Sequence, residues 1–486
     1  MQKVLADVRQ LVKRWRQPVY LVGGAVRDLA LNQPIHDLDF VVERDAIKLA
    51  YWIGDKLQVP AYVLDKERDV GRVMLDAENS LDFARFRQNN HEFGATLEDD
   101  LRARDFTMNA LAQEVRQGDA PIIDPTGGLR DLEQGVVRMV YADALEDDPA
   151  RALRALRMAG QFGFTIEAET EAAVRRMTGQ LWRISAERIR DEFLKLMMLP
   201  EPHHAILRLY ETGLLHDIAP ELIELVGVTQ SPPHHEPVFE HTLSVLRWLT
   251  LVEAAMNDTS EPMLPHFQQY EALRDYMNRR VDGGFSGWQL LRLAALFHDV
   301  GKAQTRTVEE NGRIRFLKHE KVGADIVHER LRQLKFSKAA NDTVRAIVKG
   351  HMRPFMLANQ PPITRRAVYR YFKGTAGVGV DIALLSLADN LAKDKGLPTT
   401  DGNTKEEWEW LCFVVDKLLT NNFGQPQKSV RPPKLVTGGD IMQILQIKPG
   451  REIGRILELV REAQAIGEVE TRAQALEMIR TIQQAQ

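Results

Sequence analysis

The spacing of apolar residues along the chain changes near residue 142. Before it, apolar and β-branched residues alternate with polar ones in short runs, which predicts strands. These runs are residues 20–22, 38–42, 72–75 and 81–86. Beyond Asp148 apolar residues recur every three or four positions, as in residues 153–158 and 189–197, which predicts helices. The pattern therefore predicts an α+β chain, with a small mixed α/β part followed by a long all-helical part.

The composition favours a multi-domain globular protein. A chain of 486 residues exceeds one ordinary domain, so we expect three or four packed units. No apolar run approaches the length of a membrane span, and the amino-terminal residues lack a basic segment followed by an apolar core. The single cysteine, Cys412, excludes an intramolecular disulfide framework, as is usual in a reducing compartment. We therefore expect a cytoplasmic protein with no membrane partner.

The net charge of −4 is small, so any affinity for RNA has to come from local basic patches. One candidate patch lies between Arg151 and Lys195, where arginines are interleaved with acids at helical spacing. These arginines are Arg154, Arg157, Arg175, Arg176, Arg183, Arg188 and Arg190. Any one of them is expected to be a solvated, ion-paired side chain, but together they could follow a phosphate backbone.

Residues 21 to 40 combine two features that suit phosphate chemistry. Gly23 and Gly24 lie between a predicted strand and a predicted helix, where backbone N–H groups and Arg27 could bind phosphate oxygens. Asp37 and Asp39 are two apart on an extended segment, so both project from one face and could share Mg²⁺. A chance Asp-x-Asp pair and a structural turn would explain each feature separately. Joined at this spacing, they indicate nucleotidyl transfer.

These residues and several later motifs resemble the tRNA nucleotidyltransferase and poly(A) polymerase family of the bacterial and eukaryotic type, along nearly the whole chain. The matching segments are residues 23–28, 80–87, 104–110, 124–132, 147–157 and 184–193. The resemblance implies that Asp37 and Asp39, with Asp82, are catalytic and hold Mg²⁺. It also implies nucleotide-binding roles: Gly23, Gly24, Arg27 and Arg87 at the triphosphate, Arg104, Asp105 and Asn109 at the ribose, and Asp148, Arg151, Arg154 and Arg157 on the helix that reads the base.

The chemistry of the bases supports a template role for Asp148 and Arg151. Cytosine and adenine both present an amino donor beside a ring-nitrogen acceptor, so an accepting Asp and a donating Arg can pair with either. Uracil and guanine present the reverse order. Asp148 and Arg151 are three apart and share one helix face. The simpler alternative is that Asp148 caps a helix that begins at Pro149 and forms an ordinary surface ion pair with Arg151.

The chain departs from the family pattern in three places. Ala103 stands where the family commonly has Arg, and Asp147 stands where the template motif usually opens with Glu. Only residues 88–95 separate Arg87 from the next motif, whereas members that add the complete CCA usually have a longer loop. The short loop favours an enzyme that adds CC and leaves the last A to a separate A-adding enzyme. Loop length is variable, so addition of A or of complete CCA stays open.

A second constellation resembles the HD metal-dependent phosphohydrolase superfamily. Its residues, in the family order, are His241, His298, Asp299, His351 and Asp389. Imidazole suits transition metals, and carboxylates can bridge or orient the ions, so a transition metal or Mg²⁺ is expected. His319 and His328 are further candidate ligands, although a lone helical His is more often an ordinary surface or core residue. The resemblance implies either hydrolysis of 2′,3′-cyclic phosphates or of damaged RNA ends, or a vestigial site.

The sequence thus predicts five parts. They are a catalytic head (residues 1–142), a helical neck for base recognition and RNA binding (143–230), an HD domain (231–395), a connector (396–434) and a helical tail that binds tRNA (435–486). Residues 435–441 and 448–454 resemble the small helical tail of tRNA nucleotidyltransferases, and this resemblance implies that the tail binds tRNA. A Gly-rich turn before a helix is also an ordinary cap.

We expect an enzyme that transfers CMP from CTP, with AMP from ATP left open, to the 3′ end of tRNA. Alternatives are a poly(A) polymerase, an HD phosphohydrolase whose head only binds RNA, and a non-catalytic RNA-binding scaffold.

Overall fold

The computed structural model describes residues 1–35, 37–76, 79–88, 92–117, 120–257, 267, 269–282, 284–393, 402–424 and 426–484. The chain divides into two compact units. The first contains residues 1–199 and 208–218, and the second contains residues 200–207 and 219–486. Within the described part of the chain, no helix is long and apolar enough to cross a membrane.

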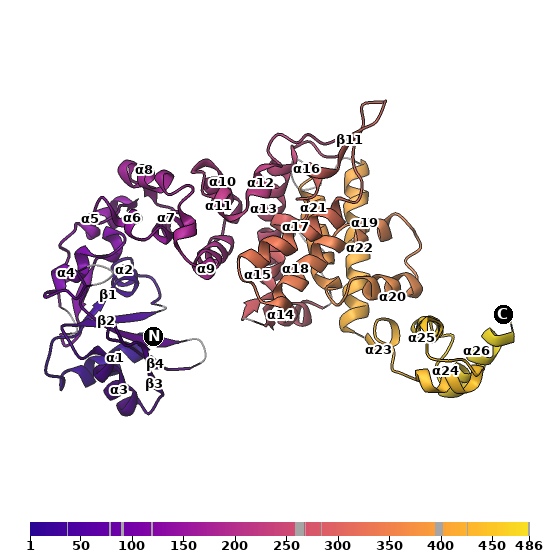
Figure 1. Ribbon diagram of the computed structural model, residues 1–486, viewed down its shortest axis with the longest axis horizontal. Coiled ribbons are helices and arrows are strands. Elements are labelled where there is room, and N and C mark those ends of the chain that lie inside the picture. The colour runs from indigo at the N-terminus through magenta and orange to yellow at the C-terminus, as the bar shows by residue number, and fades with distance from the viewer. Residues whose placement is uncertain are drawn as a thin grey trace. The chain divides into compact units, whose positions relative to one another are not determined.

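The first unit is built on a six-stranded sheet, drawn in indigo to purple in Figure 1. Its strands are β1 (Tyr20–Val22), β2 (Leu38–Val42), β3 (Ala61–Asp65), β4 (Val70–Met74), β5 (Ser80–Arg85) and β6 (Ala112–Glu114), in the order β3-β4-β5-β2-β1-β6. The β2–β5 pair is parallel and the other pairs are antiparallel. The Phe40 and Phe83 rings, from β2 and β5, stack in the core with centroids 4.9 Å apart.

Helices complete the first unit. They are α1 (Gln2–Val12), α2 (Gly24–Ala30), α3 (Ala46–Leu57), α4 (Leu97–Arg102), η1 (Thr107–Asn109), α5 (Gly128–Gln134), α6 (Ala144–Asp147), α7 (Ala150–Phe162), α8 (Ala168–Arg176), η2 (Leu181–Arg183), α9 (Ala186–Met197) and α11 (Leu215–Ile218). Strands β7 (Val136–Val137) and β8 (Thr165–Ile166) form a short parallel pair. Helix α3 packs on β3, β4 and β5, and α7 packs on α9. The Ser185 side chain caps α9, as its sequence predicts.

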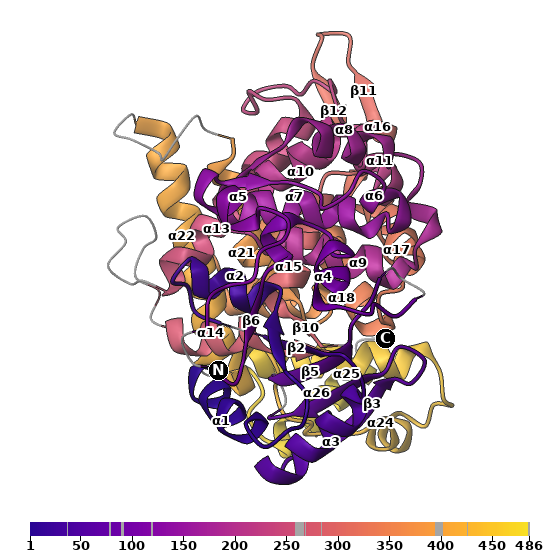
Figure 2. The ribbon, with the colours of Figure 1, turned by 90° about the vertical axis from the view of Figure 1, so that its left-hand side faces the viewer.

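The second unit is almost entirely helical. Helix α10 (Pro202–Glu211) begins in it, and α12 (Pro220–Ile223) follows. Its body contains α13 (Val238–Asn257), α14 (Tyr270–Asn278), α15 (Gly287–Phe297), α16 (Lys302–Thr305), α17 (His319–Gln333), α18 (Lys338–Gly350), α19 (Arg353–Ala358), α20 (Arg365–Gly374), α21 (Gly379–Leu391) and α22 (Gly402–Phe423). Helices α13, α15, α18 and α21 pack together around the histidine cluster. Two short hairpins pair β9 (Arg280–Val281) with β10 (Phe285–Ser286) and β11 (Arg306–Val308) with β12 (Ile314–Phe316). The β11–β12 hairpin projects from the helices in both ribbon views (Figures 1 and 2).

The carboxy-terminal helices have a small core of their own. After α23 (Pro426–Ser429), this part consists of α24 (Gly438–Leu445), α25 (Arg451–Ile466) and α26 (Arg472–Gln484). Ile441, Ile456 and Ile479, one from each helix, are fully buried against one another. Thr437 closes a capping box at the start of α24, so the turn before this helix is at least a cap. Helix α25 also packs on α20.

The predicted α+β class is confirmed: the six-stranded sheet lies before residue 142, and the described chain after it is helical apart from short two-stranded pairs. Strand β3 was missed because it is an edge strand whose middle residues, Tyr62 to Leu64, are all exposed, so its sequence lacks an alternating pattern. The long helix α22 lies within the predicted connector, residues 396–434. Residues 394–401, where the predicted connector begins, lie outside the described residues.

Candidate active site and metal cluster

The three candidate carboxylates of the head lie on neighbouring strands. Asp37 directly precedes β2, Asp39 is its second residue, and the parallel register pairs Asp39 with Asp82 on β5. Paired residues on neighbouring strands point to the same face, so Asp39 and Asp82 lie side by side. The Asp82 carboxylate accepts two hydrogen bonds from Arg72 on β4, at 2.7 Å each. These side chains offer oxygen donors only, the kind of ligand that a hard cation such as Mg²⁺ prefers.

The surroundings of Asp39 make its carboxylate harder to ionise. Solvent reaches the side chain, but many protein atoms surround it, and this loss of hydration raises its pKa to about 6. The positive charge of Arg104 opposes the rise, while the negative charges of Asp82 and Asp37 add to it. A bound cation would relieve this repulsion, because it favours the ionised form of every carboxylate around it.

The glycine pair shapes the backbone beside these carboxylates. Gly23 precedes α2 with φ +69° and ψ −135°, a conformation that only glycine adopts readily. A Cβ atom on Gly23 would lie 2.9 Å from the Arg104 guanidinium, so a side chain would also collide there. A Cβ on Gly24 would lie 3.3 Å from the Arg27 guanidinium. Both glycines therefore keep the backbone close to two arginines.

Arg27 is a buried link between three elements. Its guanidinium donates to Asp28 on the same helix and, at 2.8 Å, to Asn109 in η1. It also stacks over the Phe162 ring on α7, 4.6 Å from the centroid. Before binding a phosphate, Arg27 would therefore have to exchange one of these internal contacts.

Asp105 is a buried acceptor for donors from the head and the neck. Its Oδ2 accepts from Arg154 on α7, at 2.7 and 2.8 Å, and its Oδ1 accepts from Asn109 and the Phe106 N–H. Burial by itself would raise the pKa of Asp105, but the Arg154 charge and these hydrogen bonds outweigh it and hold the pKa below its usual range. Asp105 is therefore ionised at neutral pH.

A second buried carboxylate, Asp100, holds two more of the predicted residues. Its Oδ2 accepts from Arg104 at 2.9 Å, and its Oδ1 accepts from the backbone N–H of Arg87 at 3.1 Å. The Arg87 side chain loses hydration through burial, which lowers the pKa of its guanidinium. The Asp100 carboxylate thus holds both the backbone of Arg87 and the side chain of Arg104.

Two cavities collect most of the predicted residues. The first, the carboxylate cavity, has a volume of about 350 Å³ and is lined by Gly23, Gly24, Arg27, Asp37, Asp39, Arg104, Asp105, Asn109, Arg154 and Arg157, among others. The second, the arginine cavity, has a volume of about 630 Å³ and is lined by Arg68, Arg87, Arg104, Asp105, Asp148, Arg151, Arg154, Arg183 and Arg188, among others. Arg104, Asp105 and Arg154 line both. Asp37 and Asp39 in one cavity and Asp148 and Arg151 in the other therefore flank one shared wall, whereas Asp82 lines neither cavity.

Asp148 and Arg151 both line the arginine cavity, but they are held by different partners. Asp148 accepts from the Ala150 N–H at 3.2 Å, which caps α7, and from Arg188 on α9 at 2.7 Å. Arg151 donates to the Tyr141 hydroxyl at 3.1 Å and to the backbone carbonyls of residues 103 and 104. The capping role of Asp148 is confirmed. The simpler ion pair between Asp148 and Arg151 is wrong, because the carboxylate pairs with Arg188.

Glu192 on α9 connects the remaining predicted arginines of α7. It accepts from Arg157 at 2.8 Å, lies 3.8 Å from Arg154, and contacts Lys195 at 3.1 Å. Burial would raise the pKa of Glu192, but these positive charges outweigh it and lower the pKa. Arg154 therefore lies between two carboxylates, Asp105 and Glu192.

In the second unit, the predicted HD residues converge on the buried carboxylate of Asp299. Its Oδ2 lies 3.2 Å from His298 Nε2 and 4.0 Å from His241 Nε2, and its Oδ1 lies 3.3 Å from His319 Nε2 and 3.7 Å from His351 Nε2. Asp389 contacts His241 at 3.2 Å. His241, His298 and Asp299 form one group of potential metal ligands, and Asp299, His319 and His351 form another. Asp299 belongs to both groups.

The hydrogen bonds of three histidines turn their Nε2 atoms toward the centre of this cluster. The Nδ1 atoms of His298, His319 and His351 each contact a backbone carbonyl three residues earlier, at 2.7 to 2.8 Å. An Nδ1–H that donates to a carbonyl leaves Nε2 with a free lone pair. His319 Nε2 and His351 Nε2 nevertheless lie 3.2 Å apart, whereas His298 Nε2 lies 3.2 Å from the Asp299 carboxylate. Lone pairs that face one another fit a cation between them.

Several charges around the cluster are arranged for metal binding. Burial lowers the pKa of His351 to about 3, so this imidazole is neutral and free to act as a ligand at pH 7. Burial would raise the pKa of Asp299, but the charges of His298 and Lys302 outweigh it and hold the pKa well below its usual range. Lys302 contacts Asp299 at 2.6 Å. His328 lies outside the cluster, where it bonds to Asn341.

Three family models match successive parts of the chain. A Poly A polymerase head domain matches residues 19–138, a probable RNA and SrmB- binding site of polymerase A matches 163–225, and an HD domain matches 238–394. An A-adding tRNA nucleotidyltransferase of Deinococcus radiodurans is 35% identical over 466 residues, which cover 94% of this chain and 93% of the relative. The chain belongs to the tRNA nucleotidyltransferase family. A CC-adding tRNA nucleotidyltransferase of Thermus thermophilus is 33% identical over 463 residues, covering 93% and 91%.

Solved structures show that the fold of this tRNA nucleotidyltransferase is shared. A Bacillus stearothermophilus CCA-adding enzyme in complex with CTP has a TM-score of 0.62 and 22% identity, covering all of this chain and 99% of that one. A Thermotoga maritima CCA-adding enzyme complexed with tRNA has a TM-score of 0.57 and 20% identity, covering 99% and 96%. The family and the enzyme class predicted from the motifs are confirmed. The nucleotidyltransferase and HD families are metal-dependent, and this chain has groups of side chains that could hold metal ions.

Sequence reasoning missed several residues that shape the two head cavities of this tRNA nucleotidyltransferase. Arg72 and Asp100 bind predicted site residues, Arg68 lines the arginine cavity, and Tyr141 holds Arg151. Arg188 was noticed only as one arginine of a basic patch. Asp100 and Arg104 have the local spacing of four residues, which could have indicated their ion pair. Arg72 and Tyr141 meet their partners through the fold, so no local spacing selects them.

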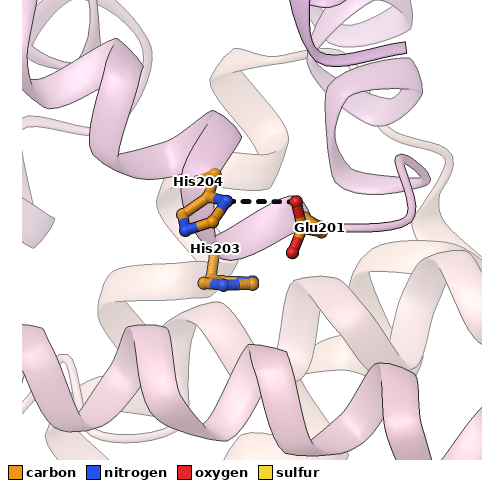
Figure 3. A group of neighbouring side chains, drawn as sticks. All are labelled: Glu201, His203 and His204. Atoms are coloured by element: carbon orange, nitrogen blue, oxygen red, sulfur yellow. Dashed lines mark hydrogen bonds and ion pairs between the residues drawn. The ribbon is translucent and has the colours of Figure 1, made fainter. Parts of the chain in front are cut away.

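A third group of potential ligands lies at the start of α10 and was not predicted. Figure 3 shows Glu201, His203 and His204, with Glu201 in contact with His204 Nδ1 at 3.3 Å. Glu201 and His204 are exposed, and burial lowers the pKa of His203 to about 4. The nearby charges of His204 and Arg247 lower this pKa further and would also repel a cation. The Asp299 cluster is therefore the better metal site.

Proposed function

We propose that this tRNA nucleotidyltransferase extends the 3′ end of tRNA by Mg²⁺-dependent, protein-templated transfer of CMP from CTP, with AMP from ATP as the finer alternative. One observation carries the proposal: the carboxylate cavity and the arginine cavity share the wall formed by Arg104, Asp105 and Arg154. A nucleotide along this wall would have its phosphates at the carboxylates and its base at Asp148.

In the proposed reaction, Asp37 and Asp39, with Asp82 beside them, hold Mg²⁺, which supplies electrostatic stabilisation of the charge that develops on the α-phosphate. The 3′-oxygen of the tRNA forms a bond to the α-phosphorus, the bond from that phosphorus to the bridging oxygen breaks, and pyrophosphate leaves. The N–H groups of Gly23 and Gly24 bind the phosphates, together with Arg27 and Arg87 from the set predicted above. Arg104, Asp105 and Asn109 hold the ribose.

Base selection is assigned to Asp148 and Arg151, with Arg154 and Arg157 supporting them from the same helix. The Asp148 carboxylate accepts from the amino group of cytosine or adenine, and Arg151 donates to the ring nitrogen. Uracil would place its carbonyl oxygen against the carboxylate, and two acceptors facing each other repel. This arrangement supports selection of C and A over U and G.

The short loop of residues 88–95 supports CC addition, although residues 89–91 lie outside the described residues. Relatives of similar identity are named A-adding and CC-adding. A relative from Chromobacterium violaceum, 32% identical over 68% of this chain and 74% of its own length, is named Multifunctional CCA protein. A separate A-adding enzyme, expected as a partner from the loop alone, is therefore not supported.

The test uses one tRNA transcript that ends at the discriminator base and another that already ends in CC. Each is incubated with Mg²⁺ and CTP, ATP or both. Two residues on the first transcript and none on the second assign CC addition. Three residues assign complete CCA addition, and a single A on the second transcript assigns A addition. Growth of long A tails on unrelated RNA would assign the poly(A) polymerase alternative, and no extension of either transcript would contradict the proposal.

A second activity, phosphoester hydrolysis in the HD domain, is favoured by the cavity beside the Asp299 cluster. This cavity has a volume of about 300 Å³ and is lined by Asp299, His319, His351 and Asp389 together with Lys302, Arg313, Arg315 and Lys393. Candidate metal ligands and basic side chains that line one cavity suit a phosphate ester. We propose a transition metal or Mg²⁺ at this cluster and substrates with terminal or 2′,3′-cyclic phosphates.

Hydrolysis of a 2′,3′-cyclic nucleotide by wild-type protein, measured with and without added Ni²⁺, Mn²⁺ or Mg²⁺, tests this second activity. Asp299→Asn is expected to abolish the hydrolysis while CMP transfer continues at the wild-type rate. Equal hydrolysis by wild type and Asp299→Asn would assign the activity to a contaminant and reject the proposal.

A further inference from the structure

The carboxylate proposed to read the base is fixed by a residue from another helix. Asp148 Oδ1 accepts from the Ala150 N–H at 3.2 Å, and Asp148 Oδ2 accepts from Arg188 Nη2 at 2.7 Å. The Asp148 side chain is 18% exposed, whereas Arg188 is 52% exposed. Arg188 thus reaches in from the rim of the arginine cavity and binds the one carboxylate oxygen that the helix cap leaves free.

The backbone of Arg188 is held firmly at the start of α9. It lies in the first turn of α9, where its backbone N–H donates to the capping Ser185 side chain. The next turn buries Ile189 and Phe193 in the core, and α9 packs along α7, which begins two residues after Asp148. The Cα of Arg188 is therefore held in place relative to Asp148, and only the side chain of Arg188 has to be ordered.

This contact still leaves Asp148 able to read a base. A carboxylate oxygen has two lone-pair sites, so Oδ2 can accept from Arg188 and from a base amino group at once. The outer torsion of an Asp side chain is soft, and the carboxylate rotates easily unless both oxygens are held. A charge-assisted hydrogen bond at 2.7 Å is strong enough to fix that rotation.

We propose that Arg188 is a positioning residue for base selection: it orients the Asp148 carboxylate so that one lone pair faces the amino group of the incoming cytosine or adenine. This inference rests on the proposed role of Asp148. It assigns Arg188 no contact with the nucleotide. Arg151 is positioned separately, by Tyr141 and two backbone carbonyls, so the two halves of the template have independent supports.

The test compares Arg188→Ala and Arg188→Lys with the wild type at saturating tRNA. The readout is the ratio of kcat/KM for CTP to that for UTP, or for ATP to that for GTP if the transcripts assign A addition. We expect Arg188→Ala to lower this ratio about tenfold, the order expected when one hydrogen bond of a base-reading pair is misplaced. The loss should lie mainly in a higher KM for CTP, and Arg188→Lys should recover part of the ratio.

Arg176→Ala is the matched control. Arg176 is 54% exposed, lies on the neck helix α8, and pairs at 3.1 Å with Glu146, two residues before Asp148. Its removal deletes a comparable ion pair but leaves the Asp148 carboxylate held, so the nucleotide ratio should stay at the wild-type value. The ratio is insensitive to any change in tRNA affinity, because both nucleotides are tested on the same tRNA.

Two outcomes would overturn the inference. An unchanged ratio in Arg188→Ala would show that the carboxylate needs no anchor, and a lower KM for CTP would show that Arg188 obstructs the base.

Asp148→Ala separates this failure from that of the proposed function. If Asp148→Ala loses selectivity and Arg188→Ala does not, only the anchor is rejected. If Asp148→Ala keeps selectivity, the template role itself is rejected. When both roles hold, the double variant is no less selective than Asp148→Ala alone.

Discussion

Asp39 and Asp82 lie side by side on the parallel strands β2 and β5, and Arg72 neutralises only the second of them. Asp82 has an internal counter-ion, while Asp39 shares its cavity with Asp37, and the positive charge that acts most strongly on Asp39 is that of Arg104. Of these three carboxylates, Asp37 and Asp39 are therefore the two that remain available to an external cation.

Replacing Asp39 should stop the chemistry without releasing the tRNA. We expect Asp39→Ala to lower CMP transfer by at least about a thousandfold, because it removes a ligand of the ion that stabilises the transition state. Asp55→Ala, on the exposed side of α3, is the matched control and should retain transfer. Filter binding of labelled tRNA should give similar affinities for all three proteins. Loss of affinity in proportion to activity would contradict a metal-binding role for Asp39.

The raised pKa of Asp39 predicts how Mg²⁺ binding depends on pH. The ion requires the ionised carboxylate, and a pKa of about 6 means that protons compete with it below neutral pH. Between pH 7.5 and pH 5 the apparent Mg²⁺ affinity of the head should fall about tenfold. The difference between calorimetric titrations of wild type and Asp39→Asn isolates this site, and a difference independent of pH would contradict the shift.

The same shift has a consequence for the stability of metal-free protein. A carboxylate whose folded pKa lies above its unfolded value contributes stability at low pH that is lost as the pH rises through about 6. Asp39→Asn removes that loss, so it should raise the melting temperature more at pH 8 than at pH 5. Thermal melts in the presence of a chelator measure this directly, and an equal rise at both pH values would argue against it.

The histidine cluster predicts a specific pattern of metal stoichiometry. His319→Ala should remove one bound transition-metal ion and leave the ion held by His241, His298 and Asp299, because Asp299 joins two groups of ligands. His328→Ala, which replaces a histidine nine positions further along the same helix and outside the cluster, should remove none. Metal analysis after equilibrium dialysis against Ni²⁺ gives the counts. Identical counts for the two variants would exclude His319 as a ligand.

Gly23 should not tolerate even a methyl group. In Gly23→Ala the new Cβ would meet the Arg104 guanidinium at 2.9 Å, in addition to a backbone strain of about 1–3 kcal/mol. Gly127→Ala is the control, since Gly127 also has a positive φ of 82° but a Cβ there meets open space. Both variants should melt at a lower temperature, and only Gly23→Ala should lose nucleotide affinity, as measured by calorimetry with CTP. Equal losses would show that strain alone matters.

Local periodicity was enough to anticipate the part of the site that lies within one element. Asp37 and Asp39 follow the alternation of a strand. Asp148 caps a helix whose start Pro149 indicates in the sequence. The pairing of Asp39 with Asp82 could be inferred only from family resemblance, because a parallel register joins segments about forty residues apart. The same distance along the chain separates Asp148 from Arg188, and no local pattern selects Arg188 from the many arginines of the neck.

The series of contacts from Asp105 through Arg154 to Glu192 joins the head to the neck helix α9, which also carries Arg188. The wall shared by the two cavities and the proposed anchor of Asp148 thus depend on the same helix. Warming that loosens α9 would release the template before it disturbs the carboxylates on the central strands. An enzyme built this way would begin to add wrong nucleotides while it still transfers them, so its upper working temperature would be set by the accuracy of nucleotide selection and not by the rate of transfer.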